Sequence, residues 1–419
     1  MEFGMIYLIA AVFLGLYMTW GIGANDVANA MGTSVGSRAI TFKQAIIIAA
    51  IFEFTGAFLA GGHVTSTIRK GIIDPTPIIN QPEILVWGML AALLAAGIWL
   101  MVASYMGWPV STTHSIVGAL VGFCIVGIGP ESVQWGKIGA IVASWIISPV
   151  IGATFGFLVM KSIQRLILDS DKPLKNALRY APFYVFLVGF LISLVTLYKG
   201  LKHLNLDLTI LQTFLAAIAI GIVLAFIGKI FIQKRQVQYQ NNNDAKSEYT
   251  QIESIFGVLQ VCTACAMAFA HGSNDVANGI GPLAAIYSIV ISGGEVMQSS
   301  PMPIWILILG GVGIIIGLAT MGHKVIRTIG TRITELVPTR GYAVGIAAAA
   351  TVVLASRTGI PVATTHIAVG AVIGVGIARG IKALNMRVIG GIFMSWIITL
   401  PVGAGLSIFF YYFLRGIFM

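Results

Sequence analysis

The sequence predicts an all-α, polytopic membrane protein with two repeats, broken helices, re-entrant hairpins and about 10–12 transmembrane segments. The first observation behind this prediction is composition, because 57% of the 419 residues are hydrophobic and only 10% are charged. A soluble globular chain carries about 25% charged residues. The second observation is a set of continuous apolar runs, such as 5–20, 84–102 and 304–318, which do not alternate as barrel strands do.

The third observation is an internal duplication. Residues 25–29 (Asn-Asp-Val-Ala-Asn) recur as 274–278, at an offset of 249. Residues 109–114 (Pro-Val-Ser-Thr-Thr-His) match 361–366 (Pro-Val-Ala-Thr-Thr-His) at an offset of 252, and Ser-Trp-Ile-Ile at 144–147 recurs at 395–398. Three matches in one register indicate two copies of one unit.

The apolar segments follow one another along the chain with short connections. They cover residues 5–20, 45–60, 84–104, 116–128, 138–160, 182–198, 210–232, 255–269, 304–321, 342–354, 367–377 and 388–413. Segments 116–128 and 367–377 are shorter than the roughly 20 residues of a membrane span. Both follow a Thr-Thr-His motif, so we predict that each is one leg of a re-entrant hairpin.

These segments divide the chain into three parts. Repeat 1 occupies residues 1–160 and repeat 2 occupies 252–419, while 161–251 holds a basic loop, two connecting spans and a polar, flexible loop. Two spans separate the basic loops at 161–179 and 233–253, so both loops lie on one side, which their positive charge makes cytoplasmic. We therefore expect a multi-pass protein of the cell (cytoplasmic) membrane. The ambiguous number of crossings leaves both parallel and inverted repeats open.

The first repeated motif places a carboxylate inside an apolar run. Glycine, Asn and Asp weaken helices, so we expect a helix break at residues 21–26 and again at 271–275. Freed carbonyl groups together with Asp26 and Asp275 form oxygen-rich sites suited to sodium. Further candidate sodium ligands are Asn25, Asn274, Gly23 and Ser273. The asparagine amides can face either a cation or an anion.

The second repeated motif has the features of an anion site. Proline ends one helix, and Ser or Thr begins another whose free N–H groups point at the ligand. Hydroxyl groups come from Ser111, Thr112 and Thr113 in the first copy and from Thr364 and Thr365 in the second, where Ala363 replaces the serine. Such a set suits a tetrahedral oxyanion.

Together, the two motifs suggest coupled transport. A carboxylate beside an anion repels it strongly at low dielectric, whereas a cation between them makes the contact favourable. Anion binding then depends on cation binding, and this linkage is reciprocal. These are the thermodynamic requirements of a symporter.

The paired motifs resemble those of the inorganic phosphate transporter family called PiT, and the resemblance covers essentially the whole chain. It implies an inverted-repeat fold, phosphate import by symport with sodium or protons through alternating access, and a homodimer. It implies Asp26 and Asp275 at the sodium sites, sodium being a coupling ion and no other cofactor being expected. The phosphate-binding candidates are Asn25, Asn29, Ser111, Thr112, Thr113, Asn274, Asn278, Thr364 and Thr365.

Other functions remain open at this point. The nearest alternatives are a proton-coupled phosphate symporter or a sulfate symporter of the same fold, and a remoter one is an anion channel. An enzyme is not expected, because no complete catalytic constellation occurs, and ATP-driven transport is not expected, because the sequence has no P-loop motif.

A few polar residues have no assigned role. Glu53 lies mid-span and is either a cation ligand, a proton carrier or a structural group. His114 and His366 are expected to hold the hairpins, although histidines can also carry protons. Arg357 has Tyr105 as its counterpart, so it lies outside the duplicated set. Gly-x-x-x-Gly at 118–122 and 370–374 is expected to permit close helix packing.

Overall fold

The computed structural model describes residues 3–60, 72–74, 76–78, 81–197, 208–241, 247–296, 303–356 and 362–419. These residues form helices and their connections, with one isolated bridge between Ile73 and Val133. Ten of the described helices are long and apolar enough to cross a membrane, in agreement with the predicted all-α membrane fold. Two shorter apolar helices, Thr112–Gly127 and Thr364–Arg379, are the predicted hairpin legs.

The first half begins with α1 (Gly4–Asn25) and α2 (Ala28–Gly36), which continue one another across a two-residue turn. α3 (Phe42–Ala60) returns, and the short η1 (Thr76–Ile78) precedes a hairpin of α5 (Pro82–Met106) and α6 (Thr112–Gly127). After η2 (Pro130–Ser132), the long α7 (Trp135–Ile163) crosses to the other end, where it leads into η3 (Gln164–Leu168).

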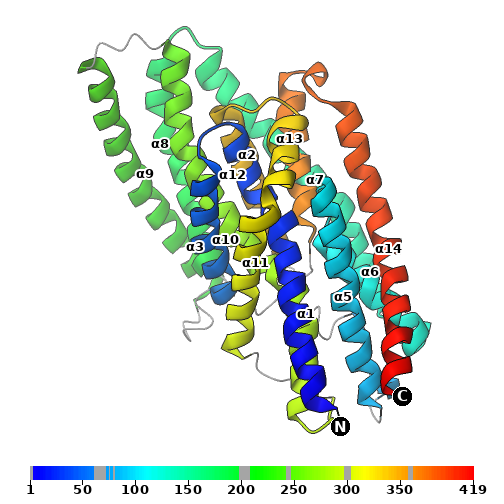
Figure 1. The fold of residues 1–419 in the computed structure, drawn as a ribbon. Coiled ribbons are helices and arrows are strands. Elements are labelled where there is room, and N and C mark those ends of the chain that lie inside the picture. Colours follow the sequence, from blue (N-terminus) through cyan, green and yellow to red (C-terminus); the bar gives the residue numbers. More distant parts are fainter. Residues whose placement is uncertain are drawn as a thin grey trace.

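The second half has a matching order of elements. α10 (Glu248–Ile291) and α11 (Ile304–Arg327) are followed by η6 (Thr328–Arg332). A second hairpin consists of α12 (Pro338–Ser356) and α13 (Thr364–Arg379), and η7 (Ile381–Ala383) leads into α14 (Met386–Phe418). The α5–α6 hairpin enters from the end where both termini lie, and the α12–α13 hairpin enters from the opposite end (Figure 1).

Each hairpin leg packs against the long last helix of the other half. α6 lies along α14, and α13 lies along α7. A Cβ atom at Gly118 or Gly122 would meet the backbone of α14, and one at Gly370 or Gly374 would meet the backbone of α7. The Gly-x-x-x-Gly pairs therefore permit the predicted close approach, and this packing connects the two halves.

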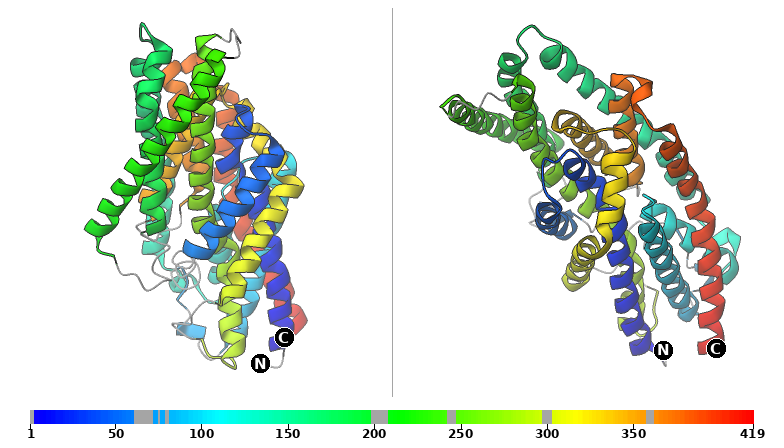
Figure 2. Two further views of the ribbon diagram at one scale, coloured as in Figure 1. Left: turned by 90° about the vertical axis from the view of Figure 1, so that its left-hand side faces the viewer. Right: turned by 45° about the horizontal axis from the view of Figure 1, so that its top comes forward.

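Two helices, α8 (Pro173–Val195) and α9 (Ile210–Asn241), connect the halves. α8 packs on α10, whereas α9 packs mainly on α8 at the edge of the molecule (Figure 2). The α7–α8 connection and the start of α10 lie at the same end, opposite both termini (Figure 1). The predicted loops 161–179 and 233–253 are largely helical instead, because η3 and the start of α8 occupy most of the first, and α9 continues to Asn241 in the second.

One expectation about helix breaks is wrong. The break at the first motif is a turn at Asp26 and Val27, but α10 continues without interruption through the second motif, and the segment predicted to end at 269 extends to Ile291. A Cβ atom at Gly272 would meet the backbone of Glu53 in α3. This glycine therefore serves a close helix crossing, and tertiary packing outweighs its weak helix propensity.

Candidate functional site

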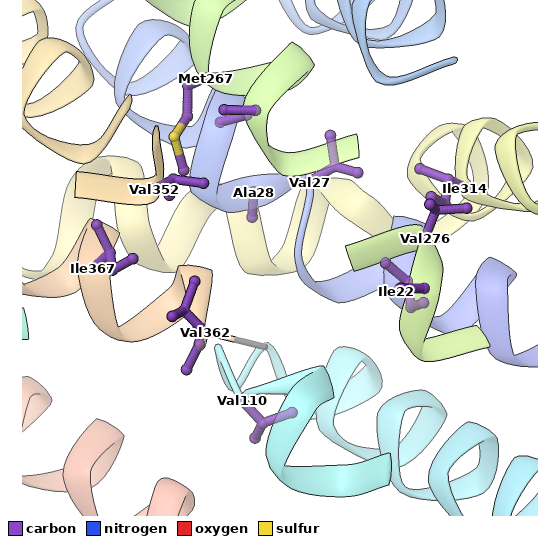
Figure 3. Packing of buried hydrophobic residues seen from close by; sticks show 14 of the residues in the cluster. Ile22, Val27, Ala28, Val110, Met267, Val276, Ile314, Val352, Val362 and Ile367 are labelled. Atoms are coloured by element: carbon purple, nitrogen blue, oxygen red, sulfur yellow. The ribbon is translucent and has the colours of Figure 1, made fainter. Parts of the chain in front are cut away.

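The duplicated motifs meet in the interior of the molecule. The α1–α2 turn and the middle of α10 supply the Asn-Asp residues, and the first turns of α6 and α13 supply the threonines. Val110 and Val362, which precede the two hairpin helices, approach each other at the hairpin tips (Figure 3). The fold therefore brings together four segments that are far apart in the sequence.

Asp26 is bound by hydroxyl groups from both halves. The Thr112 hydroxyl donates to Asp26 Oδ2 at 2.5 Å, and the Thr365 hydroxyl donates to Asp26 Oδ1 at 2.8 Å. The Asn29 amide lies 3.3 Å from the same Oδ1. Because Asp26 is only 1% exposed, these donors replace water around the carboxylate.

Asp275 has a related but different set of partners. The Thr364 hydroxyl donates to Oδ2 at 2.6 Å, and the Asn274 amide donates to Oδ1 at 2.6 Å. His271 Nε2 lies 2.8 Å from Asp275 Oδ2, and His271 Nδ1 lies 2.7 Å from Glu53 Oε2. Glu53, His271 and Asp275 thus form one continuous, fully buried row of titratable groups.

The contacts around the two carboxylates obey an approximate two-fold relation. Thr112 binds Asp26 as Thr364 binds Asp275. The Asn29 amide donates to the Thr365 hydroxyl at 2.9 Å, and its counterpart Asn278 donates to the Thr113 hydroxyl at 3.2 Å. Asn278 also donates to the Thr112 hydroxyl at 3.1 Å.

The tips of the two hairpins are held together by threonine hydroxyls, each of which contacts a backbone carbonyl of the other hairpin. The Thr113 hydroxyl donates to the Val362 carbonyl at 3.3 Å, and the Thr365 hydroxyl lies 3.0 Å from the Val110 carbonyl. Each hairpin therefore holds the backbone at the tip of the other. The N-termini of α6 and α13 meet at this point, with their dipoles directed toward the same region.

Asn25 and Asn274 fix the hairpin backbones. The Asn25 amide donates to the Trp108 carbonyl at 2.9 Å, and its Oδ1 accepts from the Val110 amide at 3.1 Å. The Asn274 amide donates to the Val362 carbonyl at 3.1 Å. All the hydrogen-bonding groups of Asn25 are directed at repeat 1, so its observed contacts are positional and not those of a free ligand.

Several buried oxygen atoms around the carboxylates have no hydrogen-bond partner among the described residues. They are Oδ1 of Asn29, Asn274 and Asn278. Ligand atoms of Asp26, His271 and Asp275 also lie within 4.8 Å of one another. Unpaired amide oxygens beside two buried carboxylates fit a small, hard cation, because such a cation would compensate the lost hydration of these oxygens.

Two predicted sodium ligands have other surroundings. Gly23 lies in the last turn of α1, where a Cβ atom would meet the Ile314 backbone of α11. The Ser273 hydroxyl donates to the Ala270 carbonyl at 2.7 Å. The Gly23 carbonyl and the lone pairs of the Ser273 hydroxyl remain candidate ligands beside the two carboxylates and the three asparagine oxygens.

The predicted anion site has the expected helix N-termini, but the serine has a structural role. Ser111 is the N-cap of α6 and accepts from the His114 amide at 3.2 Å. Ala363 occupies this position in α13, which has no side-chain cap. The free backbone N–H groups of the two first turns and the four threonine hydroxyls remain as candidates for an oxyanion.

The histidines of the hairpin motifs lie behind the site. His114 Nδ1 is 3.3 Å from the Trp396 carbonyl, and His366 Nδ1 is 3.0 Å from the Trp145 carbonyl, so each histidine bonds to the last helix of the other half. This agrees with a role in holding the hairpins. Arg357 and Pro361 lie outside the described residues.

One residue that sequence reasoning missed is His271. The 249-residue offset pairs it with Ile22, so it is absent from the duplicated pattern. Glu53 was noticed as a mid-span carboxylate, but its partner could not be deduced because 218 residues separate the two. A single buried carboxylate of this kind signals that a cationic partner is needed somewhere.

Comparison with known proteins gives consistent matches over nearly the entire chain. The family model described as "Phosphate transporter family" matches residues 22–407. A protein of Haemophilus influenzae called a putative phosphate permease is 52% identical over 410 residues, which are 98% of this chain and 97% of the relative. A putative phosphate permease of Pyrococcus abyssi is 46% identical over 401 residues, 96% of each chain.

A solved structure also matches. It is described as "The sodium-dependent phosphate transporter", and it is similar to this chain with a TM-score of 0.90 and 40% sequence identity. The match covers 98% of this chain and 100% of the other.

Proposed function

The chain belongs to the phosphate transporter family, and from this premise we propose that it imports inorganic phosphate by symport with sodium ions. Phosphate would bind between the N-termini of α6 and α13, using the threonine hydroxyls and backbone N–H groups there. Sodium would bind Asp26 and Asp275 with the oxygens of Asn29, Asn274 and Asn278.

The observation that carries this proposal is the shared set of partners at the carboxylates. Thr112 and Thr365 come from opposite hairpins, yet both donate to Asp26. The residues for the anion and those for the cation therefore touch, and each site depends on the other. Phosphate in the transmembrane interior would be repelled by two carboxylates unless cations were bound there as well. The sodium dependence named for the similar solved structure supports the same coupling ion.

The transport cycle would be alternating access around this central site. The opposite directions of the two hairpins support inverted repeats, a symmetry that lets one packing arrangement open toward either face. We further propose that the protein is a homodimer and resides in the cell (cytoplasmic) membrane.

Uptake by purified protein in liposomes tests the proposal. Labelled phosphate should accumulate when sodium is supplied outside and should not accumulate when potassium replaces it. Excess unlabelled phosphate should compete, whereas sulfate should not. Counterflow distinguishes a carrier from an anion channel, because only a carrier exchanges labelled for unlabelled substrate. Sodium-independent accumulation, or equal competition by sulfate, would reject this proposal.

A second candidate is proton coupling, and the Glu53–His271–Asp275 row supports it. His271 Nδ1 is hydrogen-bonded to Glu53, and His271 Nε2 lies at ion-pair distance from Asp275, so the row offers a path for a proton from α3 to the site. Under this alternative, an acidic exterior would drive phosphate uptake in liposomes free of sodium. Glu53→Gln would abolish that uptake, whereas sodium-driven uptake would leave a measurable rate in the same variant.

A further inference from the structure

The interior between the central site and the end where α2 terminates contains buried polar residues on two neighbouring segments, among apolar ones such as Met31. Thr33 and Ser34 of α2 and its C-cap Ser37 follow Asn29 of the site, and Asn29, Thr33 and Ser37 are spaced at intervals of four residues, which places them on one face. On α10, Gln260 and Thr263 precede His271. We call these five residues, Thr33, Ser34, Ser37, Gln260 and Thr263, the polar seam. All five are at most 8% exposed.

A hydrogen bond closes the seam at its outer end. The Ser37 hydroxyl donates to Gln260 Oε1 at 2.7 Å and joins the end of α2 to α10. The next residue, Arg38, is exposed, so this bond lies close to the surface. Gln260 Nε2 and Ser34 Oγ are buried without a partner among the described residues. Unpaired polar groups are costly in a dry interior and are stabilised when water or ions pass.

The other repeat offers an internal comparison. The 249-residue offset pairs Thr33, Ser34 and Ser37 with Pro282, Leu283 and Ile286, and it pairs Gln260 and Thr263 with Ala11 and Leu14. Every polar seam position thus has an apolar counterpart. Leu283 packs directly on Gly15 of α1. The two segments of common origin, on opposite sides of the site, therefore differ in polarity at these five positions, and the buried polar residues on the apolar side are at others, Thr19 and Ser288.

The packing of α12 against α10 also differs from the packing at the equivalent place in the other repeat. A Cβ atom at Gly341 would meet the Gln260 amide, and one at Gly345 would meet the Thr263 hydroxyl, so glycines leave space for the polar groups. The 252-residue offset pairs these glycines with Met89 and Leu93 of α5, which are apolar and buried.

Met267 lies between the seam and the site along α10, one helical turn from Thr263 and one from His271. Its side chain points toward Val352 (Figure 3). A methionine side chain is unbranched and adapts readily to changed surroundings. It can therefore move aside without a rearrangement of the helices.

We propose that the polar seam is the route by which phosphate and sodium leave the central site toward the end where α2 terminates, with Ser37 and Gln260 as its gate. This inference rests on the proposed function. The apolar counterpart, which includes Leu283 and Ile286, is a dry barrier on the other side of the site. The gate at Ser37 opens by breaking one hydrogen bond, whereas the barrier requires the separation of packed helices.

Thiol labelling tests the route without requiring transport. In a variant whose three cysteines are replaced by serine, Ser37→Cys and the matched control Ile286→Cys are each treated with a charged, membrane-impermeant maleimide from either face. Ser37→Cys should react from the face where α2 ends, about tenfold or more faster than Ile286→Cys from any face. Equal rates, faster reaction of Ile286→Cys, or reaction of Ser37→Cys from the opposite face would each overturn the proposal.

Gln260→Leu tests the gate, because it keeps the volume of the side chain and removes its polarity. The maximal rate of phosphate counterflow should fall about tenfold, while equilibrium binding of labelled phosphate in sodium stays within about twofold of wild type. An unchanged rate, or binding that weakens in parallel with the rate, would overturn the role of Gln260. Failure of the wild-type protein to bind phosphate would instead refute the proposed function, and the labelling result would stand independently.

Discussion

Asp26 and Asp275 occupy equivalent places in the duplicated sequence but have different neighbours. Two threonine hydroxyls from opposite hairpins donate to Asp26. Asp275 receives one threonine hydroxyl and also faces His271, which in turn binds Glu53. The two aspartates therefore have different surroundings, so substitutions of Asp26 and of Asp275 should have distinguishable effects.

We expect Asp26→Asn and Asp275→Asn each to reduce sodium-driven phosphate uptake by at least about tenfold, because each removes a charge that the cation requires. The measurement is initial uptake in liposomes as a function of sodium concentration. Asp169→Asn, at an exposed position in the α7–α8 connection, is the control and should behave as wild type. Wild-type sodium dependence in either site variant would exclude that carboxylate as a cation ligand.

Glu53→Ala should destabilise the protein strongly, because it leaves His271 with one anionic neighbour in place of two. Removal of one partner from a buried ion pair costs about 3–5 kcal/mol. The melting temperature in detergent should therefore fall, whereas Glu131→Ala, at an exposed glutamate in η2, should leave it unchanged. Equal melting temperatures for the two variants would mean that the row of buried groups is not an ion pair.

Among single residues, the site residues that occur in both repeats could be predicted from the sequence, whereas the role of His271, which occurs in one repeat, could not. The threonines and aspartates were visible because each occurs twice in one register. His271 was concealed because Ile22 is its counterpart. The positional role of Asn25 depends on the place of Trp108 and Val110 beside α1, which only the folded chain specifies.

Among the elements, the two hairpin helices determine the geometry of the site. α6 and α13 begin at the centre and run toward opposite ends, each packed on the long last helix of the other half. Their first turns supply the threonine hydroxyls and the free N–H groups. The position of an anion would therefore depend on both hairpins at once.

Thr112→Val combined with Thr113→Val should raise the KM for phosphate by about tenfold or more, because it removes two hydroxyls and leaves Asp26 and Asn278 with fewer partners. The control is Ser111→Ala, which copies Ala363 of the other half. It should cost about 1 kcal/mol of stability as a lost N-cap, with a much smaller change in KM. Unchanged phosphate kinetics in the double variant would remove this hairpin from the site.

Close helix crossings give a second prediction for the elements. A Cβ atom at Gly317 of α11 would meet the Trp20 carbonyl of α1, whereas a Cβ atom at Gly405 of α14 would meet nothing. Gly317→Ala should therefore lower the melting temperature. Gly405→Ala should leave it unchanged or raise it, since alanine is favoured over glycine in a helix by about 1 kcal/mol. A similar shift in both variants would contradict the close crossing.

The uninterrupted α10 shows why helix boundaries were harder to predict than helices. The residues around Gly272 and Asn274 have weak helix propensity, which suggested a break. In the fold, α3 approaches Gly272, and the Asn274 amide binds Asp275 and the hairpin backbone. Contacts between segments far apart in the sequence keep α10 helical through the motif. The local sequence carries no information about these contacts.

For the molecule as a whole, the path of the chain places both termini at one end and the basic connections at the other (Figure 1). Positive charge favours the cytoplasmic side of a membrane. We therefore expect the termini outside the cell and the α7–α8 connection inside it.

Labelling of single cysteines tests this orientation. Lys172→Cys lies in the α7–α8 connection and Met419→Cys lies at the exposed C-terminus. With the native cysteines replaced by serine, an impermeant thiol reagent added to intact cells should label Met419→Cys and spare Lys172→Cys. Inside-out vesicles should give the reverse pattern. Labelling of both from one face would contradict the path of the chain across the membrane.

The exchange of threonines between the hairpins also bears on how such a chain could arise. A polypeptide of half this length would contain one Asn-Asp motif and one hairpin, and its aspartate would lack the donor that Thr365 gives to Asp26. Because the two hairpins enter from opposite ends, two separate copies of such a half could complete each other only if they lay upside down relative to one another. Within a single chain the two halves are free to differ, and here the Glu53–His271 pair contacts Asp275.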